Sequence, residues 1–514
     1  MPAGPGHRRL EITAILRSPA VFAALGFAVA WTIQHPSFSS IALDALIVLP
    51  AVVCAIRWPL ATLVVMVVLV PFSQMTQAWL WWHEWFPADA AIHLGYAKEL
   101  VVGVALLRAW SHRPRPLERV DWLALALLAL VGLYALAPLG PALGVRYVAA
   151  RANVGFVAVF LAARWLGGSD VLRRRAEMLI PVVAGVVALL GIWNRFGPDG
   201  WQSWVDSTGI LQFRNDVMNA PTLGAVERVP FGGGEVIRAG SVLFSPNDLG
   251  FLLLVVVALI GSRVVRRVSK PWEVAIGVLC TFCIFCTFSR SAMAMFVLVG
   301  IVLAAASGRL SRGIGVIYGT GVALLLVFVL LGSGDQLASG ANASDQRTQG
   351  HIEAIDKATR AIVAHPLGSG LGTTGTLTVR FASDTGFQTE NFYLHIGVEV
   401  GVIGAVAMVA FIVMVLRMLW RRSRQVGGIA VGALAALAAV ATGGLVLETF
   451  SELATGWTLW LLVGMALPAT PAPSVDDATP GRGQAHGFGL DRERLRGAAP
   501  AGLAQSPASF RLGH

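Results

Sequence analysis

Apolar residues recur in long runs along almost the whole chain, and polar residues gather in the short segments between these runs. Windows near the length that an α-helix needs to cross ~30 Å of hydrocarbon identify the expected membrane spans. These are 19–33, 39–56, 59–72, 92–108, 120–138, 148–163, 177–194, 241–261, 272–287, 291–306, 314–332, 391–416, 428–447 and 453–467. The pattern predicts an all-α, polytopic integral membrane protein with about 12–14 transmembrane helices.

Composition and charge placement agree with this prediction. The 514 residues are 56% hydrophobic and 13% charged, more apolar surface than a soluble protein of this length could bury. The net charge of +10 would fit a nucleic-acid-binding protein, but the basic residues cluster in short loops between the apolar runs, at 108–119, 164–175, 263–270 and 417–424. This is the positive-inside pattern, so we expect cytoplasmic basic loops, both termini cytoplasmic, and no nucleic-acid partner.

The same pattern divides the chain into three parts. Residues 1–18 form a predicted cytoplasmic N-terminus, 19–467 the membrane domain, and 468–514 a disordered cytoplasmic tail rich in Pro, Gly, Ala and Arg. The run 19–33 fits a cleaved signal peptide as well, but further spans follow at once, which favours an uncleaved first helix. Cys280, Cys283 and Cys286 lie in an apolar helix and are interpreted as packing residues rather than metal ligands.

Two long segments, 195–240 and 333–390, are predicted to be external, and a loop of the second one's length is usually functional. Segment 333–390 contains a predicted amphipathic helix that ends at His365 and Pro366. The glycine-rich LGSGLGTTG (367–375) follows it. No Lys-Ser/Thr pair and no strand accompany these glycines, so both a flexible connector and a phosphate-binding loop remain open interpretations.

Several arginines retain positive charge on the predicted outer side, against the inside bias. They are Arg214, Arg238, Arg290, Arg347, Arg360 and Arg380. Arg290 lies in TFSRSAMAMF, at an abrupt junction between two apolar spans. A guanidinium at the membrane boundary either snorkels to water or binds an anion, and its bidentate fork suits a phosphate.

The stretch FSPNDLG (244–250) places polar residues at the start of an apolar span. Ser245 before Pro246 predicts a helix N-cap, with Asp248 near the positive end of the helix dipole. Asn247 and Asp248 either belong only to this first turn or also line an outer cavity.

The stretch TENFYLHIGVEVGVIG (389–404) is apolar enough to enter a bilayer but carries four polar groups. Asn391, His395 and Glu399 are spaced i, i+4, i+8 and therefore share one helical face, with Glu390 beside it at the outer end. A charge at mid-bilayer costs ~2.5–3.5 kcal/mol, so Glu399 must face protein or water. A contact between His395 and Glu399 and a role as the wall of an outward-facing site are both open.

These pieces together resemble the O-antigen ligase and polymerase superfamily of bacterial membrane glycan transferases. They follow one another in the family's order: FSPNDLG (244–250), TFSRSA (287–292), Arg347 heading the loop helix, HPLGSGLG (365–372) and ENFYLHIGVEVGVIG (390–404). The resemblance covers about residues 40–467. It departs from the family at Glu390, where relatives usually have a histidine implicated in catalysis.

The resemblance implies glycan transfer from a polyprenyl-diphosphate-linked donor to an acceptor hydroxyl, with no metal or cofactor. Arg290 and Arg347 would stabilise the leaving diphosphate, and Glu390 would be the base, with His395 and His365 as further candidates for that role. The remaining candidate substrate-binding residues are Arg238, Asn247, Asp248, Asn391, His395 and Glu399.

The leading hypothesis is thus a glycan ligase or polymerase of the bacterial inner membrane, acting on its outer face in cell-surface or exopolysaccharide biosynthesis. A transporter or flippase of a lipid-linked glycan or other anion would use the same arginines to bind rather than react. Few charges lie in the inner halves of the spans, Lys98 and Glu99 being the main pair, which argues against transport. A purely structural membrane protein leaves the outer arginines unexplained.

Overall fold

The computed structural model describes residues 48–469, apart from 115, 138, 168, 219–223, 232–233, 308–316, 325–345, 376–386 and 426–427. The predicted spans 19–33 and 314–332, the first part of 39–56, the N-terminus and nearly all of the C-terminal tail lie wholly or partly outside the described residues. All of the described residues belong to the compact unit that ends at Thr470.

Helices dominate the described part of the chain, and its only named strands form one short hairpin, β1 (Glu227–Phe231) and β2 (Gly234–Arg238), paired antiparallel. The helices of the first half are α4 (Pro59–Leu69), η1 (Val70–Phe72), α5 (Ser73–Trp82), α6 (Ala88–Trp110), α7 (Arg119–Leu136), α8 (Leu143–Leu166), α9 (Asp170–Phe196), α10 (Pro198–Ser207), α11 (Ile210–Gln212) and η2 (Phe213–Val217). Those of the second half are η3 (Ser241–Leu243), α12 (Pro246–Val265), α13 (Pro271–Cys286), α14 (Arg290–Ser307), α17 (Gln346–Ala364), α19 (Phe392–Gln425), α20 (Ile429–Gly443) and α21 (Leu453–Ala466).

Among the described residues, seven helical segments are long and apolar enough to cross a membrane, and five further apolar helices are shorter. This confirms the all-α polytopic fold. Large apolar side chains on the surface of α19, such as Val402, Ile403 and Val406, are about half exposed or more. Apolar side chains exposed along a spanning helix are those that contact lipid.

The core is built around α12, whose apolar span is 83% buried. α12 packs against α20, α13 and α14, and α8 packs against α21. Phe156 of α8 stacks on Trp460 of α21, with ring centroids 5.4 Å apart. A helix that is apolar on all sides is one enclosed by other helices, which explains the uninterrupted run LLLVVVALIG in α12.

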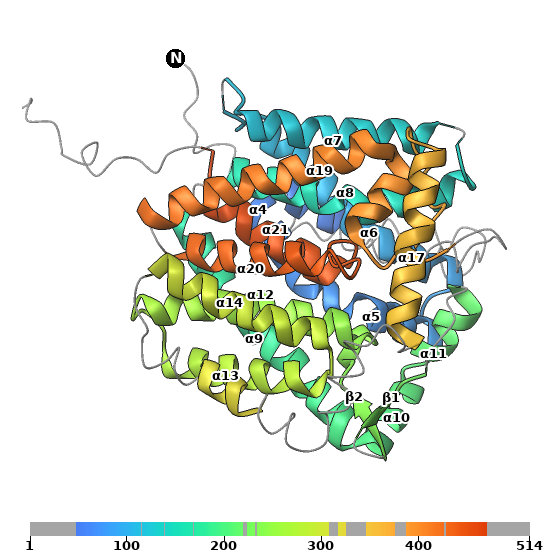
Figure 1. The fold of residues 1–514 in the computed structure, drawn as a ribbon, viewed down its shortest axis with the longest axis vertical. Coiled ribbons are helices and arrows are strands. Elements are labelled where there is room, and N and C mark those ends of the chain that lie inside the picture. The colour runs from blue at the N-terminus through green and yellow to red at the C-terminus, as the bar shows by residue number, and fades with distance from the viewer. Residues whose placement is uncertain are drawn as a thin grey trace, which may run out of the picture. The chain divides into compact units, whose positions relative to one another are not determined.

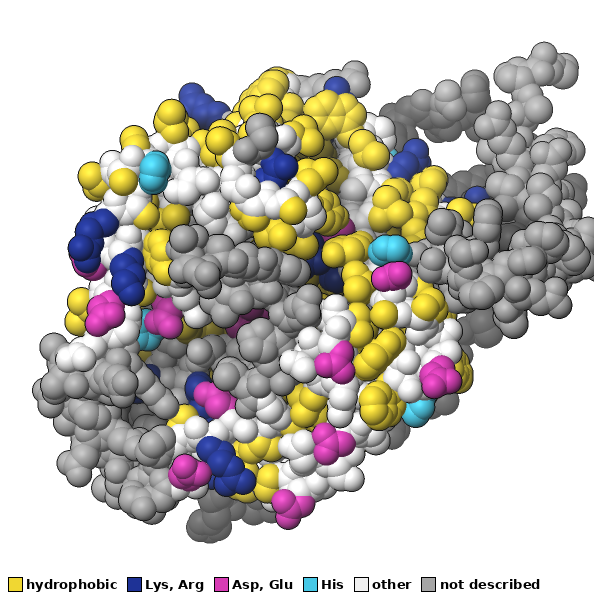
Figure 2. Space-filling view, turned by 90° about the vertical axis from the view of Figure 1, so that its right-hand side faces the viewer, with side chains coloured by type: hydrophobic (Ala, Val, Ile, Leu, Met, Phe, Trp, Pro, Cys, Tyr) yellow, Lys and Arg dark blue, Asp and Glu magenta, His cyan; other side chains and the backbone are white. Residues whose placement is uncertain are grey.

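The helix ends divide into two groups. α17, α10 and the β1–β2 hairpin lie at the end where α12, α19 and α21 begin; we call this the site end. Figure 1 shows α19, α20 and α14 side by side, with α17 running crosswise to them over that end. Figure 2 looks onto this end and shows acidic, basic and histidine side chains among apolar ones. The basic loops predicted from the sequence lie at the opposite end of the same helices.

The sequence-predicted cap of α12 is confirmed. The Ser245 side chain accepts a hydrogen bond from the Asp248 backbone N–H at 3.3 Å, and Pro246 occupies the first helical turn. The predicted span 241–261 therefore starts a few residues early, because the cap and not the first apolar residue fixes the beginning of the helix.

Candidate functional site

Residues 389–391, immediately before α19, connect the two parts of the candidate site. Asn391 caps the helix, since its Oδ1 accepts from the backbone N–H groups of Tyr393 and Leu394, both at 3.0 Å. Its Nδ2 donates to the Leu445 carbonyl at 2.7 Å, which ties the start of α19 to the loop after α20. Glu390 has a φ of 48°, in the left-handed region that is costly for a residue with a side chain. Asn391 thus fixes this segment through hydrogen bonds to the first turn of α19 and to the loop after α20.

The Glu390 side chain forms an ion pair with His351 of α17, between its Oε2 and the imidazole Nδ1. Both side chains are partly exposed, 34% for Glu390 and 44% for His351, so the pair lies at the rim of the site end. The hydrogen bond that His351 donates to Glu390 raises the pKa of His351 above its ordinary value, against the opposing effects of burial and of the positive charge on Arg290. Arg290 is therefore among the charged groups that act on this imidazole.

One predicted arginine, Arg290, acts on the His351 imidazole, and a second, Arg347, stands on the same helix as His351. Arg290 is the first residue of α14 and is exposed. Arg347 lies in the first turn of α17, four residues before His351 and hence on the same helical face. His351 was not predicted from the sequence, although its spacing from Arg347 within the loop helix was a signal that could have identified it.

Arg238 and Asn247 hold the junction that presents Arg290. The Arg238 guanidinium pairs with Glu227 at 2.5 Å, donates to the Thr287 carbonyl at 2.8 Å and donates to Asn247 Oδ1 at 3.1 Å. Asn247 Oδ1 also accepts from Ser289 Oγ at 2.8 Å, one residue before Arg290. These contacts join the hairpin and the starts of α12 and α14, so both side chains serve the scaffold in this arrangement.

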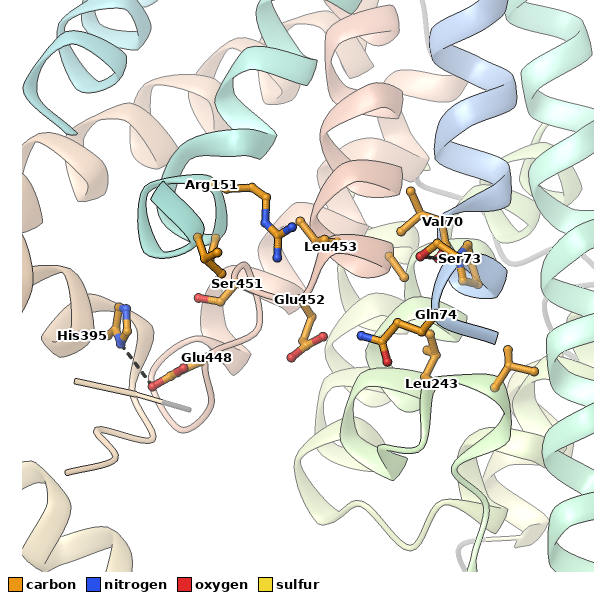
Figure 3. A pocket seen from close by; sticks show the side chains of 15 residues that line it. Val70, Ser73, Gln74, Arg151, Leu243, His395, Glu448, Ser451, Glu452 and Leu453 are labelled. Atoms are coloured by element: carbon orange, nitrogen blue, oxygen red, sulfur yellow. Dashed lines mark hydrogen bonds and ion pairs between the residues drawn. The ribbon is translucent and has the colours of Figure 1, made fainter. Parts of the chain in front are cut away.

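Behind the rim lies a cavity of about 180 Å³, lined by polar groups from α8, α19 and the segment before α21. Figure 3 shows His395, Glu448 and Ser451 on one side, Glu452 projecting into the space and Gln74 on the other side. Thr389 Oγ1 donates to Glu448 Oε1 at 2.8 Å, so the residue next to Glu390 contacts the cavity wall. The rim and the cavity are thus adjacent parts of one region.

His395 bridges two carboxylates. Its Nδ1 lies 3.3 Å from Glu448 Oε1 and its Nε2 lies 3.4 Å from Glu399 Oε2. Burial alone would raise the pKa of Glu448, but the attraction of His395 and the hydrogen bonds from His395 and Thr389 lower it. Glu448 is therefore a carboxylate at the cavity wall, and the predicted contact between His395 and Glu399 is present.

Glu399 is fully buried, and its charge is compensated by several partners. Asn153 Nδ2 donates to Glu399 Oε2 at 2.6 Å, and the Gly372 backbone N–H donates to Oε1 at 2.7 Å, in addition to the His395 contact. A buried charge is tolerated when it is paired and hydrogen-bonded. Glu399 therefore supports His395 and fixes the glycine-rich segment from inside the protein.

The glycine-rich segment supplies backbone hydrogen bonds at a break in α19. Gly401 interrupts the helix with a φ of 84°, and the carbonyls of Val398 and Glu399 accept hydrogen bonds from Ser369 N at 2.8 Å and Gly370 N at 3.1 Å. Irregular backbone at membrane depth is stable where protein satisfies its polar groups. The backbone amides of Ser369, Gly370 and Gly372 in the glycine-rich segment thus donate to α19, through the carbonyls of Val398 and Glu399 and the Glu399 side chain.

A second acidic group, Glu452, projects into the cavity. The charge of Asp248, followed by burial, raises the pKa of Glu452 well above its ordinary value. Burial lowers the pKa of Arg214, against the attraction of Glu452 and Asp248. Glu452 is solvent-accessible, and its side chain faces the open space of the cavity. Asp248 is not among the residues that line this cavity, but it acts on Glu452, a residue that the sequence interpretation missed.

Arg151 of α8 also lines the cavity, and it pairs with Glu99 at 3.0 Å, which in turn lies 3.5 Å from Lys98. The predicted Lys98–Glu99 pair is therefore part of a network that reaches the cavity. Arg151 lies inside the predicted span 148–163, and a cation at such a position was a signal that the sequence interpretation did not use.

Other predicted candidates lie elsewhere. Arg360 is exposed and pairs with Asp356 on α17. His365 follows α17, about 21 Å along the helix axis from His351 at 1.5 Å per residue, so it is remote from the rim pair. Arg380 lies outside the described residues.

Comparison with families of known proteins gives a match over residues 275–409 to the family described as O-antigen ligase. The matched region runs from α13 into α19 and contains Arg290, Arg347, His351, Glu390 and Glu399. A search of curated proteins found no match to the chain. The family match confirms the resemblance of this membrane protein to the O-antigen ligase and polymerase superfamily, whose members are membrane glycan ligases and polymerases.

Proposed function

We propose that the protein transfers or polymerises a glycan from a polyprenyl-diphosphate carrier onto an acceptor hydroxyl, at the site end and on the outer face of the bacterial inner membrane. The observation that carries this proposal is the Glu390–His351 pair beside Arg290, within the region that matches the O-antigen ligase family. The carboxylate can accept a proton, and the neighbouring cation can bind an anion, so both functions are available in one place.

The donor diphosphate would bind at Arg290 and Arg347. When the bond between the anomeric carbon and the diphosphate oxygen breaks, the electron pair stays on the diphosphate and negative charge accumulates there. Guanidinium groups stabilise such charge through paired N–H donors, so the two arginines can perform this task without a metal ion. Arg238 and Asn247 would act on this step indirectly, by holding the junction before Arg290.

The acceptor hydroxyl would lose its proton to Glu390 as its oxygen forms the new bond to the anomeric carbon. His351 engages Glu390 Oε2, and we assign the other carboxylate oxygen, Oε1, as the atom that takes the proton. The adjacent cavity, with Glu448, Glu452 and Gln74 on its walls, offers hydrogen-bond partners to the other hydroxyls of an acceptor sugar. His395 and Glu399 would position Glu448 rather than react.

Reconstitution into liposomes with a lipid-linked oligosaccharide tests this function. Chain growth, or transfer of the glycan to a second acceptor with release of the lipid diphosphate, is the expected result. Movement of the intact lipid-linked glycan across the bilayer without any new glycosidic bond would instead identify a flippase. The Arg290→Ala variant should abolish product formation, and normal product from it would overturn the site assignment.

A further inference from the structure

A second cavity, of about 580 Å³, lies at the end of the helix bundle opposite to the candidate site. It is formed where α9, α13 and α20 begin and where α12, α19 and α21 end. Three of the basic loops recognised in the sequence, 164–175, 263–270 and 417–424, contribute residues to it. None of these residues takes part in the proposed glycan transfer.

The walls of this cavity carry six basic side chains and two carboxylates. The two carboxylates are occupied within the protein, because Arg263 pairs with Glu177 at 2.6 Å and with Glu273 at 3.0 Å. Apart from Arg263 and its neighbour Arg173, the basic side chains that line the cavity are Arg174, Arg266, Lys270 and Arg422. In the described part of the chain these four form no ion pair with a carboxylate, so the cavity has a strong net positive charge.

The positive-inside rule alone places basic residues at this end but does not make them converge. Here they come from three separate loops and surround a space in the size range of small-ligand sites. Apolar side chains, including Met178, Val268 and Trp272, line the same space. A cavity that combines a cationic wall with an apolar wall, at the end of membrane-spanning helices, suits a ligand with a phosphate group joined to a hydrocarbon chain.

We propose that this basic cavity binds the phosphate-bearing headgroup of an anionic membrane lipid. Arg266 and Arg422 contact the phosphate oxygens through their guanidinium groups, and the acyl chains leave the cavity past the apolar wall into the bilayer. The shared chemistry is that of a phosphate, and the apolar wall favours a lipid over a free phosphorylated metabolite.

Native mass spectrometry of the purified full-length protein tests the proposal, with added phosphatidylglycerol or cardiolipin and with phosphatidylethanolamine as the zwitterionic reference. We expect the wild-type protein to retain the anionic lipid in preference to the reference. Substitution of Arg422→Gln should weaken this retention about fivefold, and Arg266→Gln together with Arg422→Gln about 25-fold. The matched control is Arg424→Gln, because Arg424 is on the same turn of α19 but packs over the Trp420 ring outside the cavity.

Absence of any preference for anionic lipid in the wild-type protein would overturn the proposal, as would equal losses in the Arg422→Gln and Arg424→Gln variants. Glycerol phosphate supplied without lipid separates the two sources of phosphate. If it displaces the retained lipid at equal concentration, the ligand is a soluble phosphorylated molecule and the lipid assignment fails. Because Arg266 packs against Gly428, the single Arg422→Gln variant decides the outcome if the double variant does not purify as a monodisperse protein.

Discussion

His351 of α17 and Glu390 before α19 form an ion pair at the rim of the candidate site. The pair joins the loop helix α17 to the segment that begins α19, and both residues lie within the region that matches the O-antigen ligase family. The imidazole comes from one helix and the carboxylate from the segment before another, so each side chain can be replaced separately.

Under the proposed function, replacement of Arg290 or Arg347 by alanine should reduce glycan product at least about a hundredfold, because each substitution removes a cation that would stabilise the leaving diphosphate. The measurement is chain growth or transfer in liposomes, together with gel filtration to show that the variant inserts and remains monodisperse. Arg360→Ala is the matched control, since Arg360 is exposed on the same helix as Arg347 and pairs only locally with Asp356. Equal activity of the Arg347→Ala and Arg360→Ala variants would contradict the role of Arg347.

Glu390→Gln should be severely impaired, because an amide of the same shape cannot accept a proton at neutral pH. Glu390→His should be partly active, since an imidazole can take up the proton. Initial rates with a saturating donor measure both variants. A fully active Gln variant would remove Glu390 as the base, and the test would then move to Glu448, which lies next to Thr389 in the cavity wall.

The affinity for the donor should fall as pH rises. The hydrogen bond that His351 donates to Glu390 raises the pKa of His351 in the folded protein above the value of about 6.5 that the unfolded chain has. The paired, protonated form is therefore fully present below about pH 6.5 and is lost as pH rises through the folded-state pKa. Since deprotonation removes a positive charge near Arg290, KM for the diphosphate donor should increase over this range while kcat changes less.

The His351→Gln variant is the control for this pH dependence. It retains a hydrogen-bond donor for Glu390 but has no proton to lose, so its KM should be independent of pH between about 6 and 9. A wild-type pH profile that persists unchanged in this variant would show that another group is responsible.

Gly401→Ala should destabilise the protein. The substitution places a side chain at a φ of 84°, and its Cβ would approach the Leu367 carbonyl carbon to 2.5 Å, so we expect a loss of about 1–3 kcal/mol. Gly103→Ala in α6 is the matched control, because nothing lies within 4 Å of its added Cβ and helical Ala is favoured over Gly. Thermal unfolding in detergent compares the two, and a similar melting temperature for both would contradict the proposed role of the break.

The fold was predictable because a chain that folds in lipid carries long apolar runs, which are easily recognised in the sequence. Long apolar runs such as LLLVVVALIG in α12 and the paired cap Ser245–Pro246 fix spans and boundaries locally. The break in α19 was not predictable from its own residues. Gly401 in GVEVGVIG looks like any small residue in a membrane helix. The helix is interrupted there because backbone amides about 30 residues earlier in the chain donate to the preceding carbonyls of α19.

The candidate site was partly predictable for a similar reason. Asn391, His395 and Glu399 share a face that period and polarity reveal, and His395 does contact Glu399. Arg151, Glu448 and Glu452 carry no such signal, because each approaches the cavity through tertiary packing of its helix or loop. His351 lies in the loop helix α17, and no local sequence pattern indicates that this helix lies over the start of α19.

The broken helix α19 has a mechanical consequence for the site. Ordinarily, the turn that carries His395 and Glu399 would be bonded onward to the rest of its own helix, and it would move with that helix in the bilayer. Here the last carbonyls of this turn accept hydrogen bonds from the segment that follows α17. In addition, Ile362 of α17 packs at Gly397. Under the proposed function, any tilt of α17 that accompanies donor binding would therefore displace the turn that carries His395 and Glu399.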